Sequence, residues 1–178
     1  IKDNPSQFRK AISISPPLNK VLRYDVNGNQ LQVTSHAELD SNTTYTVVLS
    51  TSVQDLNNNN LISPFHLTFS TGSQIDTLEL NGSVQYPLGG SSRLSPNIKI
   101  GLYPMGSPRK NYGYLKALAD STGEVDPKPD IFIEKPLYVT GTDTSGTYSF
   151  KGLKSGYYEL IAFDDKNNNT LINLPGEK

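Results

Sequence analysis

The densest cluster of oxygen-bearing side chains in this sequence follows a predicted strand near the end of the chain. Residues 157–163 are rich in β-favouring types, and Asp165, Asn167 and Asn169 follow at every second position. A loop that curls can turn alternate side chains inward, and Ca²⁺ binds about six to eight oxygen atoms. One hypothesis is therefore a calcium site, with Ca²⁺ as the cofactor, formed by Asp165, Asn167 and Asn169.

The second hypothesis for the same residues is an Asn-rich turn that holds no ion. Asp and Asn side chains accept hydrogen bonds from backbone N–H groups close to them in the chain, so such a cluster can stabilise itself. Asn173 and Glu177 would complete the calcium ligands, but Glu177 falls one place late for an EF-hand loop and Thr170 stands where Gly is needed. The weaker cluster at 55–59 allows the same two interpretations.

Other kinds of chemistry find little support in the sequence. The chain has no cysteine, which excludes disulfides, thiolate metal sites and cysteine nucleophiles. His36 and His66 are its only histidines, and both are expected on strand or loop surfaces. No metalloprotease, nucleophile-elbow or phosphate-loop motif occurs. Four carboxylates in the middle of the chain are expected to be solvated loop charges: Asp120, Glu124, Asp126 and Asp130. We therefore predict a protein that is not an enzyme.

Composition limits the fold and the partners. With 16 basic and 17 acidic residues the net charge is -1, so no basic surface is available for nucleic acid. No apolar run is long enough to span a membrane, and the first residues lack the features of a secretory signal. The 14 Gly and 12 Pro, among many Asn, Ser and Thr, favour an all-β, turn-rich fold.

The first predicted unit comprises residues 1–73. Pro16 ends the first strand because proline cannot donate to a ladder, and Asn27-Gly28 predicts a tight hairpin. Tyr45, Val47 and Leu49 alternate and share one face of a strand. The expected strands are 8–15, 21–24, 31–33, 44–49 and 67–70.

Four segments of this unit resemble a bacterial Ig-like domain of the S-layer type. They are 14–17 (ISPP), 39–49 (LDSNTTYTVVL), 53–61 (VQDLNNNNL) and 69–72 (FSTG), in the order typical of that family. The resemblance implies an Ig-like β-sandwich. That family has one more strand before the first of these segments, so residues 1–73 are expected to lack it.

The second predicted unit comprises residues 74–178. Strands are expected at 78–84, 98–102, 137–140, 147–150 and 157–163, the last of them as a central strand. The stretch TDTSGTYSFKGLKSGYYELIAFDDKNNN, residues 142–169, resembles the transthyretin-like, or carboxypeptidase-regulatory-like, sandwich. The resemblances imply an all-β protein of two tandem β-sandwiches. The order of the two units resembles Ig-like envelope lipoproteins of Bacteroidetes-type bacteria.

Residues 105–135 have weak periodicity and are long for a loop inside a domain. They form either a partner-binding insertion or a disordered segment. Exposed tyrosines are favoured in protein and carbohydrate contacts, so Tyr112, Tyr114 and Tyr138 are candidate contact residues. Tyr157 or Tyr158, which follow Gly156, is instead expected to form a tyrosine corner.

The resemblance implies a non-catalytic structural or interaction module of the bacterial cell envelope. The full-length protein would be lipid-anchored, in the periplasm or on the cell surface, with other envelope proteins or glycan as partners. Two alternatives remain at this point. One is a carbohydrate- or protein-binding module that uses 105–135, and the other is an accessory domain of a larger envelope enzyme or transport complex, because fold alone does not specify function.

Overall fold

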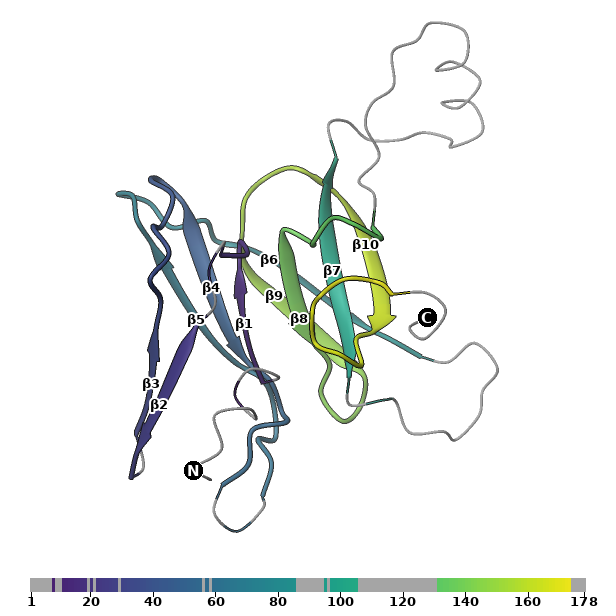
Figure 1. Cartoon of the computed structure of the whole chain (residues 1–178). Helices are drawn as coiled ribbons and strands as arrows, with labels where there is room; N and C mark the ends of the chain where they lie inside the picture. Colours follow the sequence, from purple (N-terminus) through teal and green to yellow (C-terminus); the bar gives the residue numbers. More distant parts are fainter. Residues whose placement is uncertain are drawn as a thin grey trace, which may run out of the picture.

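The computed structural model confirms the predicted all-β class. It describes residues 8, 11–18, 20, 22–28, 30–55, 57, 59–85, 95, 97–105 and 131–173. Ten strands lie in these residues (Figure 1), and all their pairings are antiparallel. They are β1 (Ile12–Ser15), β2 (Arg23–Asn27), β3 (Gln30–Thr34), β4 (Thr44–Leu49), β5 (Phe65–Ser70), β6 (Leu78–Ser83), β7 (Ile98–Met105), β8 (Tyr138–Gly141), β9 (Thr147–Leu153) and β10 (Tyr157–Asp164).

Strands β1 to β5 form the N-terminal half, which consists of the sheet β1-β4-β5 and the hairpin β2-β3. A hydrophobic core lies between these two layers. The predicted face of β4 points into it: Tyr45 is 1% exposed, and Val47 and Leu49 pack against the core. Its buried members are Phe8, Ala11, Ile12 and Val53. The alternation seen in the sequence thus predicts this side of the sheet correctly.

The predicted boundaries of β1, β2, β3 and β5 change by a few residues, whereas those of β4 hold. β1 ends at Ser15 as expected, but it begins at Ile12 rather than at residue 8. The hairpin is present, but Asn27 pairs with Gln30, so Gly28 rather than Asn27 is the first turn residue. Gly28 has a φ of 59°, the left-handed conformation that such a two-residue turn requires.

Strands β6 to β10 form the C-terminal half, in which the sheets β10-β7-β8 and β6-β9 enclose a second core. The expectation that 157–163 is a central strand is wrong, because β10 pairs with β7 alone among the described strands. β7 is the central strand, and its first six residues are all buried. A strand covered on both faces belongs in the middle of a sheet, whereas β10 exposes Tyr157 and Leu160.

A tyrosine corner closes the turn before β10. The hydroxyl of Tyr158 donates to the carbonyl of Lys154 at 2.9 Å, and the hydroxyl of Tyr138 accepts from the N–H of Lys154 at 3.2 Å. The two rings pack edge to face, with centroids 5.8 Å apart. Tyr158 therefore fulfils the expectation made for this turn, while Tyr157 is 54% exposed.

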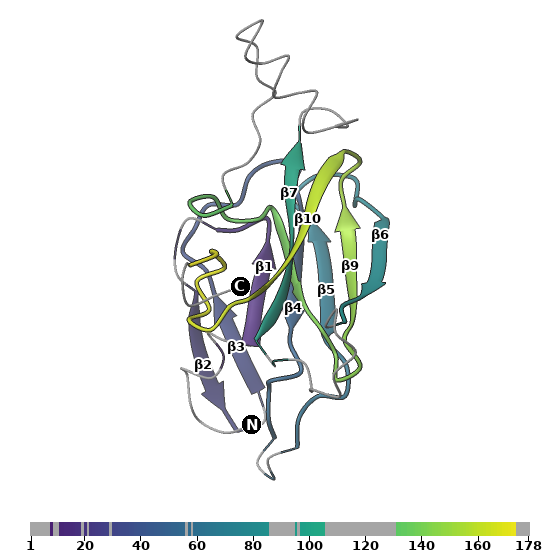
Figure 2. The same cartoon turned by 90° about the vertical axis from the view of Figure 1, so that its right-hand side faces the viewer.

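The two halves pack against each other through the second face of the sheet β1-β4-β5. In the two views of Figures 1 and 2, β9 lies against β4 and β5, and β8 lies against β1. Thr44, Thr46 and Val48 are 4%, 4% and 3% exposed, so β4 is buried on both faces. The hydroxyl of Thr46 donates to the carbonyl of Lys151 at 2.9 Å. The sequence predicted only one buried face of β4.

Further hydrogen bonds join the halves at β8 and at the short segment between β5 and β6. The N–H of Val139 donates to the hydroxyl oxygen of Ser15 at 2.9 Å, within the buried interface. The N–H of Asp76 donates to the hydroxyl oxygen of Thr44, also at 2.9 Å. Hydroxyl groups thus satisfy backbone groups that the contact between the halves removes from water.

Gly152 of β9 packs closely against β4 and β5 of the N-terminal half. Its φ is 70°, and a Cβ atom there would lie 2.8 Å from both Thr46 Oγ1 and Thr68 Cγ2. Both the backbone conformation and the lack of space require glycine at this position. The threonine side chains of β4 and β5 therefore rest directly on the backbone of β9.

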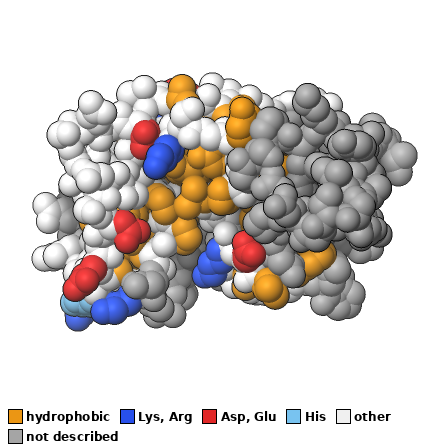
Figure 3. Space-filling view, turned by 90° about the horizontal axis from the view of Figure 1, so that it is seen from above, with side chains coloured by type: hydrophobic (Ala, Val, Ile, Leu, Met, Phe, Trp, Pro, Cys, Tyr) orange, Lys and Arg blue, Asp and Glu red, His pale blue; other side chains and the backbone are white. Residues whose placement is uncertain are grey.

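Some apolar side chains remain exposed on the strands at the sheet edges. Phe65 and Leu67 of β5 are 58% and 53% exposed, and Leu78 of β6 is 53% exposed. Within the described residues β5 and β6 each pair with one strand. Figure 3 shows hydrophobic side chains gathered near the middle of one end of the molecule, with charged side chains beside them. The two-layer packing of each half leaves Phe65, Leu67 and Leu78 uncovered.

We predict that Gly152→Ala destabilises the protein more than Gly28→Ala. Both glycines have a positive φ, but a Cβ at Gly28 would meet nothing within 4 Å. Gly28→Ala should cost about 1 kcal/mol of unfolding free energy from backbone strain alone. Gly152→Ala should cost about 3 kcal/mol, because overpacking against Thr46 and Thr68 adds to the strain. Urea unfolding measures both, and equal losses would contradict close packing at Gly152.

We also predict a loss of stability between pH 10 and 12. Burial raises the pKa of Tyr103 and of Tyr158 to about 12. Unfolded tyrosines lose their proton near pH 10. Between pH 10 and 12 the unfolded chain therefore binds fewer protons than the folded chain, so unfolding becomes more favourable as pH rises. Urea unfolding across this range should show a shallower pH dependence for Tyr158→Phe. The exposed-residue control Tyr157→Phe should match the wild type; equal slopes for all three would refute the shift at Tyr158.

Candidate functional site

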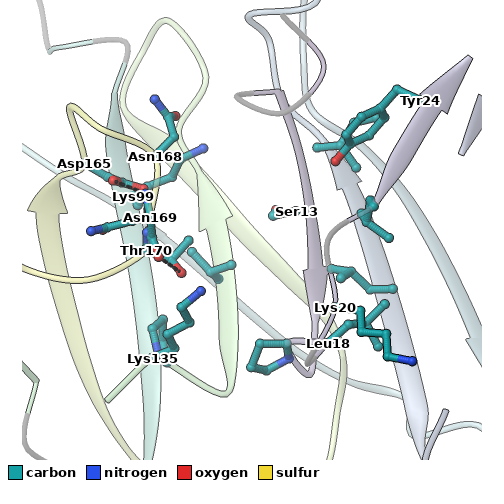
Figure 4. Close-up of a pocket in the computed structure, with 16 residues that line it drawn as sticks. Ser13, Leu18, Lys20, Tyr24, Lys99, Lys135, Asp165, Asn168, Asn169 and Thr170 are labelled. Atoms are coloured by element: carbon teal, nitrogen blue, oxygen red, sulfur yellow. Dashed lines mark hydrogen bonds between the residues drawn. The ribbon is translucent and has the colours of Figure 1, made fainter. Parts of the chain in front are cut away.

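A pocket of about 260 Å³ lies between the two halves. One wall comes from β1 and residues 17–24 of the N-terminal half. The other comes from β7, residues 135–139 and the loop that follows β10. Figure 4 shows Asp165, Lys99 and Lys135 on one side and Ser13, Leu18, Lys20 and Tyr24 on the other. The predicted Asp/Asn loop therefore lies at the junction of the halves.

β10 ends at Asp164 and delivers Asp165 into the fold, where it is 0% exposed. Its Oδ1 accepts from the N–H of Asn169 at 3.1 Å, and its Oδ2 accepts from the N–H of Thr170 at 3.2 Å. Its own N–H donates to the carbonyl of Asn97 at 3.1 Å. Asp165 is thus held at the base of the loop, and its carboxylate curls the chain back on itself.

Three of the four asparagines of the loop, Asn167, Asn169 and Asn173, converge. The side-chain N–H groups of Asn167 and Asn169 both donate to Asn173 Oδ1 at 2.8 Å. Asn167 Oδ1 also accepts from the N–H of Asn169 at 2.9 Å. Thr170, at the place where an EF-hand loop has Gly, has a φ of 61°. The structure therefore brings together the residues predicted from their spacing, apart from Glu177, which lies outside the described residues.

Lys99 is a site residue that the sequence analysis did not identify. It lies in β7, is 8% exposed and lines the pocket. Burial lowers the pKa of Lys99, and the charge of Asp165 partly opposes this effect. Within the described part of the chain, no hydrogen bond or ion pair joins its Nζ to another residue. Lys99 stands between Ile98 and Ile100, where alternation alone would suggest a solvent face, but the central strand β7 is buried on both faces.

The calcium hypothesis stays a prediction. The described residues contain no group of three or more His, Cys, Asp or Glu side chains that could hold a metal ion. The convergence of Asn167, Asn169 and Asn173 suits an ion site, because each amide carries an oxygen. The hydrogen bonds that these oxygens and Asp165 accept, and the positive charge of Lys99 nearby, favour the turn.

The second Asp/Asn cluster has the bonds of a turn. Asp55 Oδ1 accepts from the N–H groups of Asn57 and Asn59, both at 2.8 Å. Asp55 Oδ2 accepts from the side-chain amide of Asn59 at 2.9 Å. Hydrogen bonds, above all that from the Asn59 side chain, lower the pKa of Asp55. The cluster stabilises its own loop at the surface.

The candidate tyrosine contacts separate into two groups. Tyr138 is 4% exposed and belongs to the core of the C-terminal half, because β8 lies between β7 and the N-terminal half. It is a packing residue and adds nothing to an exposed aromatic patch. Tyr112 and Tyr114 lie outside the described residues, as do most of 105–135 and the four carboxylates predicted to be solvated.

The two histidines lie in different surroundings. His36 is on the surface, where its carbonyl accepts from Lys20 Nζ at 3.1 Å. His66 is half-buried between the halves, beside a cavity of about 10 Å³, and burial lowers its pKa. Its position was expected on a surface, but β9 covers that face of β5. Of the two histidines, only His66 lines this cavity.

The N-terminal half has two layers around one core and ends with β5, as the predicted Ig-like sandwich does. Residues 3–71 match the family model of a bacterial Ig-like domain. Bacterial Ig-like domains of this kind occur in surface or envelope proteins and are typically non-catalytic. The match ends at Thr71, just after β5 of the Ig-like segment.

Comparison with curated proteins and with solved structures found no match to this chain. The transthyretin-like resemblance of residues 142–169 therefore stays an expectation. Among the described residues there is no helix with the length and apolar character needed to cross a membrane.

The two hypotheses for the loop at Asp165 predict different melts. A calcium ion that binds only the folded chain should raise Tm by several degrees when EDTA is replaced by millimolar Ca²⁺. Asp165→Ala should abolish the increase. Asp143→Ala is the matched control, because Asp143 also accepts backbone N–H bonds in a loop, at 2.8 and 2.9 Å. The turn hypothesis predicts no shift in any variant.

Proposed function

We propose that the chain is a non-catalytic structural module of a bacterial cell-envelope protein. In this proposal residues 1–73 are an Ig-like domain and residues 74–178 a transthyretin-like domain. The two act as one stiff unit that spaces or docks other envelope components. The full-length protein would be a lipoprotein, which incorporation of labelled palmitate by its source bacterium would test.

The contact between the halves carries this proposal. A flexible tandem needs a linker and a small interface, whereas here the face of one sheet rests on the backbone of β9. Gly152 leaves no space between β9 and the threonines of β4 and β5, since a Cβ atom at this position would lie 2.8 Å from their side chains. Three hydrogen bonds, from Thr46, Val139 and Asp76, cross the contact or fix the joint. Such a contact resists bending.

The family match supports the envelope setting, and the chemistry of the site supports a structural role. The carboxylates of Asp165 and Asp55 both accept hydrogen bonds from backbone N–H groups of their own loops, and these bonds fix the shape of each loop. A carboxylate in that state stabilises a turn and is poorly placed to act as a general base. Partners of the stiff unit would be other envelope proteins or glycan.

We predict that the halves tumble together in solution. ¹⁵N relaxation of the 178-residue chain should give one rotational correlation time for amides in β4 and in β7. Gly152→Val should separate the halves, because a branched side chain cannot fit against Thr46 and Thr68. Amides of the two halves should then give different, shorter correlation times.

Gly28→Val is the control, because Gly28 also has a positive φ but lies in the β2-β3 hairpin, where a Cβ would meet nothing within 4 Å. It should keep one correlation time. Two correlation times in the wild-type chain would refute the stiff unit and leave a flexible tandem. Loss of dispersed signals in Gly152→Val would mean that the halves depend on each other for folding, and the wild-type measurement would then decide alone.

A further inference from the structure

We infer that the pocket between the halves binds a small organic anion, a hydroxylated carboxylate of about the size of a sugar acid. Lys99 is the residue that would hold its carboxylate. The inference rests on the contact between the halves, because each half supplies one wall of the pocket, but it does not depend on the envelope setting. The two can be told apart, since Lys99→Met tests the ligand while the correlation time of the wild-type chain tests the contact.

Lys99 carries the inference. A buried ammonium without hydrogen-bond acceptors is costly, so buried lysines are normally paired. Lys99 is 8% exposed and borders the pocket, yet no hydrogen bond or ion pair links its Nζ to the rest of the described chain. Lys99 Nζ is not among the fully buried unpaired atoms of the described chain, so it is open to the pocket. An anion in the pocket would supply an acceptor for it.

Asp165 is close to Lys99 but is engaged elsewhere. Its two carboxylate oxygens accept from the N–H groups of Asn169 and Thr170 at 3.1 and 3.2 Å. Figure 4 shows Asp165 held by these bonds within the loop, with Lys99 next to it. The carboxylate of Asp165 moderates the charge of the pocket without filling it.

The other charges of the pocket are positive. Lys135 is an exposed residue on the same wall as Lys99 (Figure 4). Lys20 lies on the opposite wall, with its Nζ donating to the His36 carbonyl at 3.1 Å. Three lysines against one aspartate attract an anion. Lys20 already donates to His36 and Lys135 is exposed, so in the buried part of the pocket Lys99 alone faces the ligand, with Asp165 opposing its charge. This balance favours a singly charged carboxylate over a doubly charged phosphate.

The remaining lining describes the body of the ligand. Ser13 and Asn168 line the pocket, and their side chains make no hydrogen bond with another described residue, which suits hydroxyl groups on the ligand. Apolar side chains form much of the wall of the N-terminal half: Ile12, Ile14, Pro17, Leu18 and Leu22. A volume of about 260 Å³ limits the ligand to a small molecule.

The test is an NMR titration of the 178-residue chain with glucuronate. We expect saturable shifts of the amides of Ser13, Lys99 and Asn168 at millimolar ligand, and none with glucose, which lacks the carboxylate. Lys99→Met keeps an unbranched side chain of similar shape and removes its charge, and it should weaken binding by at least about tenfold. Lys154→Met, at an exposed position outside the pocket, should bind as the wild type does.

Three results would overturn the inference: no saturable shift with glucuronate, an equal response to glucose, or unchanged binding by Lys99→Met. If Lys99→Met does not fold, Lys135→Met replaces it, because Lys135 is exposed and its loss should weaken binding without affecting the fold. In that case unchanged binding by Lys135→Met, together with binding that does not weaken as salt is raised, would overturn it.

Discussion

The structure depends on the contact between Gly152 and the threonines of β4 and β5. A Cβ at Gly152 would lie 2.8 Å from Thr46 and Thr68, so no side chain larger than that of glycine fits between the backbone of β9 and these two threonines. This contact buries the second face of β4 and positions β8 beside β1. The pocket follows from it, since one wall belongs to each half. One glycine thus links the packing of the sheets to the candidate site.

Local patterns predict most of the strands and turns. Alternation of Tyr45, Val47 and Leu49 identifies the core face of β4, and the hairpin at Gly28 and the corner at Tyr158 follow from residue types that fit them. The loop at Asp165 also gathers as its spacing predicts. These features arise from residues close together in the chain, where the sequence carries the relevant physical information.

Features that depend on distant partners could not be predicted in the same way. Thr46 bonds to Lys151, 105 residues away, and nothing in the TYTVV pattern indicates that its threonine face is buried. Tyr138 was misplaced, and Lys99 was missed, for a related reason. Their burial follows from the central position of β7 and from the packing of β8 against the other half, and both are properties of the whole fold.

The hydroxyl character of the contact face has a consequence for biosynthesis. The bond between Ser15 and Val139 spans 124 residues, so the N-terminal half leaves the ribosome long before the strand that covers it. A leucine-rich face would meanwhile be open to aggregation. Thr46 can bind water until β9 arrives, and then exchanges it for the carbonyl of Lys151 in the new strand. Thr44 makes the same exchange earlier, when the N–H of Asp76 reaches it. The same hydroxyl groups therefore keep this face hydrated in the nascent chain and form hydrogen bonds to the covering backbone in the folded protein.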